Sequence, residues 1–221
     1  MTTILLARHG ESDWNHERRW QGHADRPLTE RGREQASALA ERLEDIRLDA
    51  VYSSDLERAR ATAKVVAAAR GLELRQLRAL REVDVGSWSG LTRGEAEQRH
   101  PDDFARWLQG GTGWPDGETY EAMSERVLRA IAQIVAEHPE GRVLVVSHGG
   151  PIRAVHAAAL GMHVHEYRRL RPVEPNARLS AVCTENGRLT RLCPANEIPD
   201  LIAEEERRRD EAAARRPSPA G

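Results

Sequence analysis

The chain alternates short apolar runs with longer segments of helical periodicity, and this order constrains its fold more than any other feature. The runs that predict buried strands are residues 3–7, 48–54, 72–77 and 141–150. The segments that predict helices are residues 29–44, 55–71, 119–138 and 151–161, the last with Pro151 at its first helical position. Strands that alternate with helices pair in parallel and are covered on both faces, so we expect an α/β protein.

Two stretches depart from this alternation. Residues 86–118 hold seven glycines and the loop-like sequence GGTGWPDG, with short helices expected at 92–99 and 101–108. Long irregular segments in compact domains often cover binding sites, so we expect an insertion over one end of the sheet. Residues 203–221 are highly charged and lack aromatic side chains, so we expect a flexible, solvated C-terminal tail after a single domain at 1–202.

A hairpin is expected at 177–193, around Asn186 and Gly187. Its strands carry the two cysteines of the chain, Cys183 and Cys193, which match no zinc spacing and are interpreted as small apolar residues. The hairpin would offer an edge strand through which two copies of the chain could pair, so a homodimer is one expectation.

Composition excludes several classes of function. The 221 residues carry a net charge of −2, so no overall field favours nucleic acid or an anionic membrane surface. The apolar runs are far shorter than a membrane-spanning helix, and the first of them is too short for a secretory signal. We therefore expect a soluble protein of the reducing cytoplasm that binds neither nucleic acid nor a membrane.

Reactive and charged side chains stand where the expected strands end. The sequence RHG at 8–10 follows the first apolar run, and SHGG at 147–150 ends the last one. Arg58 falls in the first turn of the helix after the second run, and Glu82 follows the third run. In an open parallel sheet, ligands bind beyond the carboxyl ends of the strands. We therefore expect two histidines, two arginines and one glutamate to meet at one edge of the sheet.

These residue types suit the hydrolysis of a phosphate monoester. Arg8 and Arg58 can hold phosphate oxygens through charge-assisted hydrogen bonds. A neutral imidazole can attack phosphorus, and His9 is favoured over His148 because a nearby carbonyl in the tight turn can hold one ring N–H and fix the tautomer. Glu82 in its acid form can protonate the leaving alkoxide and then deprotonate water. Phosphoryl transfer needs mainly positioning and charge stabilisation, so neither a metal nor another cofactor is expected.

Other residues leave alternatives open. Trp14 and Trp20 either pack beneath the first loop or stack on a substrate. Arg153 either reaches the rim of the pocket or has a solvated or ion-paired role. His163 and His165 could share one face of a strand as metal ligands, but no third ligand motif accompanies them.

In these residues the sequence resembles the histidine phosphatase superfamily, in the branch of the cofactor-dependent phosphoglycerate mutases and their phosphatase relatives. The matching stretches are LARHGESDWN, QGHADRPLTERGREQA, VYSSDLERARATA, LREVDVGSWSGLT and VLVVSHGGPIR, which keep the order of the family and cover most of residues 3–160. The resemblance implies a three-layer α/β/α sandwich with a mostly parallel sheet.

The resemblance also implies a role for individual residues. It makes His9 the nucleophile that becomes phosphorylated and Glu82 the proton donor and acceptor. The residues that it implies for binding the phosphoryl group or the substrate are Arg8, Arg58, His148, Asn15, Gln21, Gly22 and Gly149.

Within the family, the sequence favours a phosphatase. After Glu82 the chain reads VDVGSWSGLTRGE, which is closer to the phosphatases than to the mutases, and the insertion at 86–118 is short. We predict a metal-independent phosphatase that acts through a phosphohistidine on a small phosphorylated metabolite. A phosphoglycerate mutase is the alternative within the family, and a non-catalytic module that binds a phosphate ligand is the alternative of another class. The sequence does not choose among sugar phosphates, phosphoglycerate derivatives, phosphoserine and nucleotide-pathway monoesters.

Overall fold

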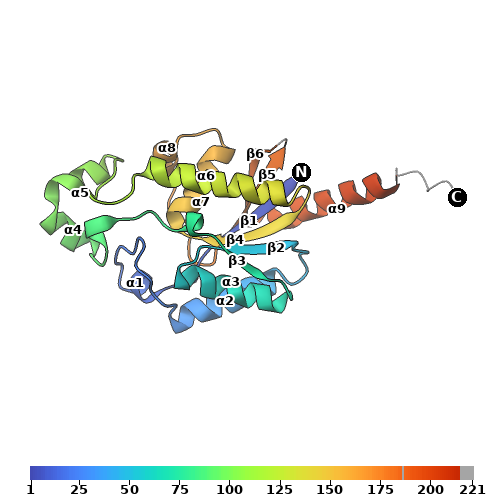
Figure 1. Ribbon diagram of the computed structural model, residues 1–221, viewed down its shortest axis with the longest axis horizontal. Coiled ribbons are helices and arrows are strands. Elements are labelled where there is room, and N and C mark those ends of the chain that lie inside the picture. Colours follow the sequence, from blue (N-terminus) through green and yellow to red (C-terminus); the bar gives the residue numbers. More distant parts are fainter. Residues whose placement is uncertain (186, 215–221) are drawn as a thin grey trace.

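The computed structural model describes residues 1–185 and 187–214, and a six-stranded sheet forms its centre (Figure 1). The strands are β1 (Thr2–Arg8), β2 (Ala50–Ser53), β3 (Leu74–Gln76), β4 (Arg142–Ser147), β5 (Leu179–Glu185) and β6 (Arg188–Pro194). Their order across the sheet is β3-β2-β4-β1-β5-β6. The first four in that order run parallel, whereas β5 is antiparallel to β1 and β6 is antiparallel to β5. The expectation of a mostly parallel sheet is confirmed.

Helices cover both faces of the sheet (Figure 1). One layer holds α2 (Glu30–Arg42), α3 (Glu57–Ala69) and α9 (Ile198–Ala214). The other layer holds α6 (Tyr120–Glu137), α7 (Gly149–Ala159) and α8 (Val164–Leu170). The short helices α1 (Asp13–His16), α4 (Arg93–Arg99) and α5 (Pro101–Leu108) lie beyond the carboxyl ends of the parallel strands, at the left of Figure 1. Single 3-10 turns occur at Arg78–Leu80 and Gly86–Trp88. The chain thus forms the three-layer sandwich that the resemblance implied.

The side chains of β1 show why this sheet is buried on both faces. Ile4 and Leu6 pack in the layer of α6 and α7, whereas Leu5 and Ala7 pack in the layer of α2 and α3. A central parallel strand has no solvent-facing side, so its sequence is continuously apolar rather than alternating. Within residues 1–185 and 187–214, no helix combines the length and the apolarity needed to cross a bilayer.

Local signals place most helix ends. Thr29 precedes α2, and its side chain accepts a hydrogen bond from the N–H of Gly32. Gly71 follows α3 with a left-handed φ of 62°, which glycine adopts without a steric penalty. One boundary was wrong: α7 begins at Gly149, so Pro151 is its third residue rather than its first. The first N–H groups of a helix have no acceptor within the helix, so proline is tolerated at this position also.

The hairpin formed by β5 and β6 is confirmed, although Asn186 itself lies outside the described residues. Cys183 and Cys193 are free and buried within it, as small apolar residues would be. The sequence left open whether His163 and His165 share one face of a strand as metal ligands. These residues do not lie on a strand. His163 caps α8 and His165 lies in its first turn, where the two rings stack with centroids 5.4 Å apart.

The C-terminal segment differs from the expected flexible tail. Helix α9 runs continuously across the expected domain boundary at 202–203. Glu205 in this helix is only 5% exposed, and its carboxylate lies 2.6 Å from the guanidinium of Arg142, which is 1% exposed at the start of β4. The hydroxyl of Thr3 donates a hydrogen bond to the same carboxylate. A buried ion pair therefore holds α9 to the sheet, and residues 215–221 lie outside the described part of the chain.

The insertion at 86–118 packs around a cluster of aromatic rings. Trp20 meets Trp88, Trp107 and Trp114 edge to face, with ring centroids 5.2 to 6.0 Å apart. Phe104 lies beside Trp88 at 5.9 Å. The two short helices expected here are confirmed as α4 and α5. Trp20 packs in this cluster and also lines the cavity described below.

Candidate active site

Two histidines leave the sheet side by side at its carboxyl edge. Strands β1 and β4 are neighbours, and Arg8 is paired with Ser147, so the next residues, His9 and His148, follow adjacent strand ends. The N–H of His9 donates to the carbonyl of Ser147 at 3.0 Å. The two imidazole centroids are 5.1 Å apart, and the ring planes are inclined by 60°. The meeting of these histidines, expected from the sequence, is what the structure shows.

The ring of His9 is oriented by its own turn. Its Nδ1 lies 2.7 Å from the carbonyl oxygen of Gly10. Because a carbonyl can only accept, Nδ1 carries the proton of the neutral ring and Nε2 keeps its lone pair. Gly10 cannot be exchanged freely, since a Cβ there would lie 2.3 Å from the carbonyl oxygen of Gly32. The nearby carbonyl expected from the sequence is therefore present.

Both imidazoles are held in the neutral form. Burial lowers the pKa of His9 and of His148 well below the usual value of 6.5, and the positive charges of Arg58 and Arg8 lower both pKa values further. Within the described part of the chain, neither ring nitrogen of His148 has a hydrogen-bond partner. Both of these nitrogens are buried, since His148 is fully enclosed.

Arg58 and Arg8 place two guanidinium groups beside the histidines. Arg58 is 1% exposed, and its two terminal nitrogens donate to the carbonyls of Ala24 at 2.8 Å and Gly22 at 2.9 Å. One terminal nitrogen of Arg8 donates to the carbonyl of Glu174 at 2.8 Å. The Nε of each arginine is buried and has no partner among the described residues. Burial lowers the pKa of Arg58 to about 10, so this group keeps its charge at neutral pH.

Glu82 faces the histidines from the loop after β3. Its Oε1 accepts hydrogen bonds from the N–H of Val83 at 2.9 Å and from the N–H of Gly150 at 3.0 Å. A Cβ on Gly150 would lie 2.3 Å from this oxygen, and one on Gly149 would lie 2.7 Å from Cγ1 of Val173. Gly150 therefore allows the backbone to approach the carboxylate, and Gly149 allows it to approach Val173.

The loop after β1 supplies two amides. The hydroxyl of Ser12 lies 3.1 Å from Oδ1 of Asn15 and 2.8 Å from Oε1 of Gln21. Because these oxygens face Ser12, the amide nitrogens are the groups left for a ligand. Gly22 follows with a φ of 50°, and a Cβ there would lie 2.7 Å from a methyl group of Val85.

One cavity of about 290 Å³ collects the residues that the sequence singled out. Those that line it are Arg8, His9, Asn15, Gln21, Gly22, Arg58, Glu82 and Gly149. His148 is fully buried against His9. Arg153 also lines the cavity, which decides between its two alternatives in favour of the rim.

Sequence reasoning missed the residue that holds the loop of Glu82. Arg126, in α6, donates to the carbonyls of Ala79 at 2.8 Å and Glu82 at 2.7 Å. Its Nε lies 2.6 Å from a carboxylate oxygen of Glu118. No local pattern marks Arg126, because all of these partners but Glu118 belong to a distant loop. Tyr120 and Val173, which line the cavity, also lacked a signal in the sequence.

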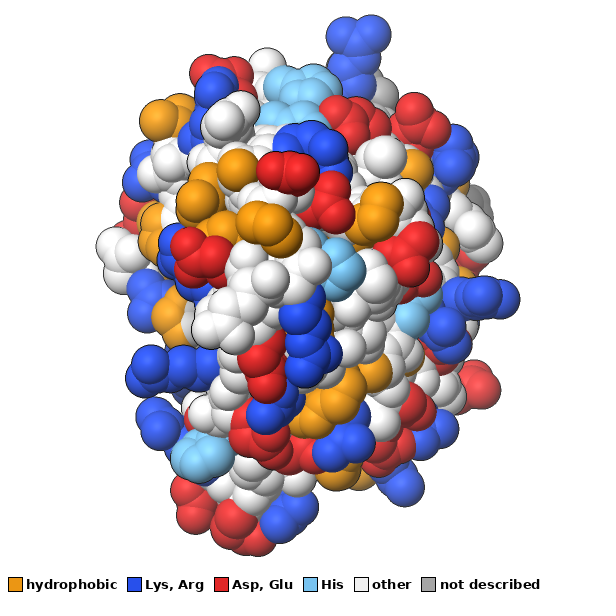
Figure 2. All heavy atoms as spheres, turned by 90° about the vertical axis from the view of Figure 1, so that its left-hand side faces the viewer, with side chains coloured by type: hydrophobic (Ala, Val, Ile, Leu, Met, Phe, Trp, Pro, Cys, Tyr) orange, Lys and Arg blue, Asp and Glu red, His pale blue; other side chains and the backbone are white. Residues whose placement is uncertain are grey.

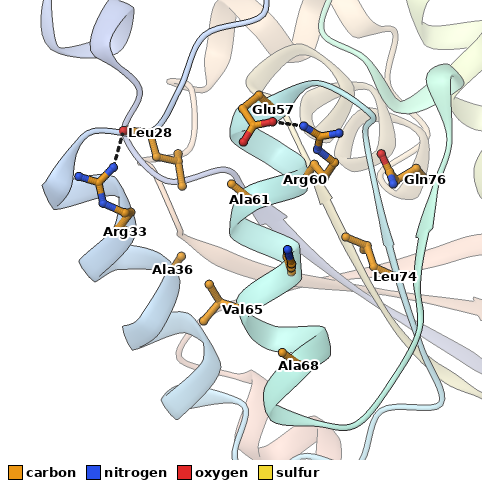
Figure 3. Close-up of a pocket in the computed structure, with 11 residues that line it drawn as sticks. Leu28, Arg33, Ala36, Glu57, Arg60, Ala61, Val65, Ala68, Leu74 and Gln76 are labelled. Atoms are coloured by element: carbon orange, nitrogen blue, oxygen red, sulfur yellow. Dashed lines mark hydrogen bonds and ion pairs between the residues drawn. The ribbon is translucent and has the colours of Figure 1, made fainter.

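A second and larger hollow, of about 850 Å³, lies between α2, α3 and β3 (Figure 3). Three of the charged groups that line it already have partners, since Arg60 pairs with Glu57 and Arg33 donates to the carbonyl of Leu28 at 3.1 Å. None of the predicted site residues lines it. Size alone therefore does not locate the candidate site. Among the residues that the structure describes, no three His, Cys, Asp or Glu side chains are grouped to hold a metal ion.

The fold and the cavity define an α/β protein with a cationic pocket at the carboxyl edge of its sheet. The chain belongs to the histidine phosphatase superfamily, branch 1, whose family model matches residues 4–196.

The chain is also similar to named relatives and to solved structures. Phosphoserine phosphatase 1 of Hydrogenobacter thermophilus is 37% identical over 169 residues, which are 76% of this chain and 80% of that protein. The probable phosphoglycerate mutase GpmB of Citrobacter koseri is 38% identical over 182 residues, covering 77% of this chain and 80% of that one. The mycobacterial glucosyl-3-phosphoglycerate phosphatase, solved with VO3, superposes with a TM-score of 0.79 at 31% identity over 86% of this chain and 96% of that chain.

We expect the protein to lose stability in mild acid. His9, His148 and His156 are buried, and burial lowers the pKa of each, that of His156 to about 4. In the unfolded chain these groups titrate near their usual value, so below about pH 6.5 the unfolded state binds more protons. The free energy of unfolding should therefore fall as the pH drops from about 6.5 towards the folded-state pKa values, by up to ~1.4 kcal/mol per pH unit for each group. Urea unfolding between about pH 7 and about pH 5 measures this loss, and equal stabilities across that range would contradict it.

Proposed function

We propose that this protein hydrolyses phosphate monoesters of small metabolites through a phosphohistidine intermediate. The observation that carries the proposal is the placement of two neutral imidazoles, two arginines and one glutamate around a single cavity. Membership of the histidine phosphatase superfamily supports it, as do the phosphatase names of the Hydrogenobacter relative and of the mycobacterial structure.

In the first step, Nε2 of His9 attacks phosphorus in line with the leaving oxygen. A P–N bond forms while the P–O bond breaks, and the leaving oxygen takes a proton from the protonated carboxyl of Glu82. The carbonyl of Gly10 keeps the other ring proton on Nδ1, so the attacking nitrogen is unprotonated. In the second step, Glu82 takes a proton from water, whose oxygen attacks phosphorus and breaks the P–N bond. Inorganic phosphate leaves, and His9 and Glu82 return to their starting states.

The groups around the phosphoryl oxygens supply the charge stabilisation. Arg8, Arg58 and His148 each carry a buried nitrogen without a partner among the described residues, and a bound phosphate would satisfy these groups. We assign Asn15 and Gln21 further contacts through their amide nitrogens, and Gly149 a contact through its backbone N–H. These contacts stabilise the negative charge spread over the phosphoryl oxygens in the transition state, while Glu82 neutralises the charge on the leaving oxygen.

Phosphate release from an aryl phosphate in a buffer that contains a chelator tests the proposed function. Release that continues under chelation is expected, because no step of the mechanism uses a metal. A pure protein that releases no phosphate would instead be a non-catalytic binding module. Interconversion of phosphoglycerates without release of phosphate would identify a mutase, the activity named for the Citrobacter relative.

Replacement of Glu82 by Gln should separate good from poor leaving groups. An alkyl phosphate needs a proton on its departing oxygen, so kcat should fall by about 10²- to 10⁴-fold. An activated aryl phosphate leaves as a stable anion and should lose much less. Steady-state kinetics with both esters measures the difference, and an equal loss with the two would remove Glu82 from the acid role.

We also propose a cytoplasmic location and a homodimer. Cys183 and Cys193 are free thiols, a state that a reducing compartment maintains. Strand β6 lies at an edge of the sheet, where a second copy could add its own strand. Cell fractionation tests the first proposal, and analytical ultracentrifugation tests the second.

A further inference from the structure

The cavity carries more positive charge than a phosphoryl group can neutralise. Its lining includes six arginines, and Glu82 is the only carboxylate among the described lining residues. The arginines are Arg8, Arg18, Arg19, Arg58, Arg93 and Arg153. A phosphate monoester brings close to two negative charges, which Arg8 and Arg58 offset. Elsewhere on this end of the molecule, acidic and basic side chains intermix (Figure 2).

Only one of the remaining arginines is neutralised by the protein itself. Arg19 lies 2.7 Å from a carboxylate oxygen of Glu17 and 2.9 Å from one of Glu95. Arg18, Arg93 and Arg153 form no ion pair with any carboxylate of the described chain, and of these three Arg93 and Arg153 have side chains held by aromatic or hydrogen-bond contacts. These two guanidinium groups therefore bring uncompensated charge to the cavity wall.

Arg153 is the deeper of the two. It lies one helical turn after Gly149 on α7, so both residues face the same side of the helix. One terminal nitrogen donates to the carbonyl of Arg171 at 2.7 Å, while its Nε is buried without a partner among the described residues. The positive charge of Arg153 acts on Arg8, whose pKa it helps to lower. A ligand that covered Arg153 without pairing with it would leave a desolvated cation, which is costly.

Arg93 reaches the cavity from the insertion at the first residue of α4. Its guanidinium carbon lies 5.6 Å from the ring centroids of both Phe104 and Trp107. Its side chain makes no hydrogen bond within residues 1–185 and 187–214. Stacking on aromatic rings fixes the plane of the guanidinium and leaves its N–H edge free for a planar, two-oxygen acceptor.

We propose that the substrate carries a carboxylate in addition to its phosphoryl group, and that Arg153 and Arg93 receive this carboxylate. The inference rests on the proposed phosphatase function and narrows its substrate to phosphorylated hydroxy acids. A cavity of about 290 Å³ suits a small monoester of this kind. The planar guanidinium also matches a carboxylate, because two of its N–H groups can donate in parallel to the two carboxylate oxygens.

The test compares 3-phosphooxypropanoate with its primary amide, which keeps the shape and the leaving group but lacks the second charge. The wild-type protein should prefer the carboxylate by roughly 10- to 100-fold in kcat/KM, the range expected for hydrogen bonds to charged groups. Arg153→Gln and Arg93→Gln should each reduce this preference, measured as the ratio of kcat/KM for the acid to kcat/KM for the amide. Arg99→Gln is the matched control, because Arg99 is exposed on α4 and does not line the cavity.

The outcomes separate this inference from the proposed function. Hydrolysis of an aryl phosphate together with equal kcat/KM values for the acid and the amide would overturn the carboxylate site and keep the phosphatase. An absence of hydrolysis with every ester would overturn the phosphatase itself. A bisphosphate preferred over the carboxylate, with the preference lost in Arg153→Gln, would show that the second anion is a phosphate and overturn the assignment. Since Arg93 is exposed, its variant tests the site without a risk to folding.

Discussion

Replacement of His9 by Ala should abolish phosphate release, with kcat reduced by about 10⁴-fold or more. The wild-type protein, quenched during turnover, should carry one phosphoryl group that is stable in base and lost in acid. This adduct should be absent from His9→Ala, because the carbonyl of Gly10 fixes the tautomer of His9 and leaves Nε2 unprotonated, whereas no hydrogen bond among the described residues fixes the ring of His148. Rapid quench followed by mass spectrometry measures the adduct, and an assay of inorganic phosphate measures the rate.

One control variant and two contrary outcomes test the assignment of His9 as the nucleophile. His16→Ala removes an exposed imidazole of α1, and both the adduct and the activity should survive. The ring of His9 makes a hydrogen bond only within its own turn, so His9→Ala should still fold, and thermal unfolding checks this. Label found on Ser12 or on His148, or an adduct that persists in His9→Ala, would overturn the assignment of the nucleophile.

Replacement of Glu205 by Gln should destabilise the protein by about 3–5 kcal/mol, as expected when one partner of a buried ion pair is removed. The change removes the close, buried counter-charge of the Arg142 guanidinium, which is 1% exposed, and leaves it only the exposed carboxylate of Glu206 at 3.8 Å. It also weakens the acceptor of the Thr3 hydroxyl. Urea unfolding measures the free energy, and the activity of the folded fraction should remain close to that of the wild type. The outcome bears on the domain boundary, which we propose lies beyond residue 202.

The neighbouring residue offers a matched control for this stability prediction. Glu204 pairs with Arg191 and Arg208 at the surface, so Glu204→Gln should change the free energy of unfolding by no more than about 0.5 kcal/mol. If Glu205→Gln and Glu204→Gln unfold at the same urea concentration as the wild type, the segment after 202 contributes nothing to the domain. That result would restore the tail expected from the sequence.

The candidate site was predictable because short sequence motifs mark its residues and because a general rule for parallel sheets brings those motifs together. An apolar run that stops at Arg8 and His9 marks a strand end, and the same reasoning places His148. The rule that parallel strands present their carboxyl ends at one edge then brings these groups together without knowledge of their distances. The nine residues predicted for the site all lie in or against one cavity, although their roles stay predictions.

The features that sequence reasoning missed depend on partners far along the chain. Glu205 stands in a charged segment that reads as solvated, and only Arg142, on a distant strand, makes its burial possible. Arg126 resembles any other arginine on a helix until the loop of Glu82 folds against it. The start of α7 was misplaced for a different reason, since Pro151 fits several positions of a first helical turn.

The pairing of β1 with β4 also determines when the candidate site can assemble during synthesis of the chain. His9 follows β1 directly, but the neighbouring strand β4 ends at Ser147, much later in the sequence. Between these points β1 has neither of its neighbours, because β5 follows later still. Contacts so distant in sequence make folding slow, and they leave an apolar strand exposed in the nascent chain. Fragments that end before β4 should therefore aggregate readily and bind no phosphate, so His9 can take its place in the site only after β4 has been synthesised.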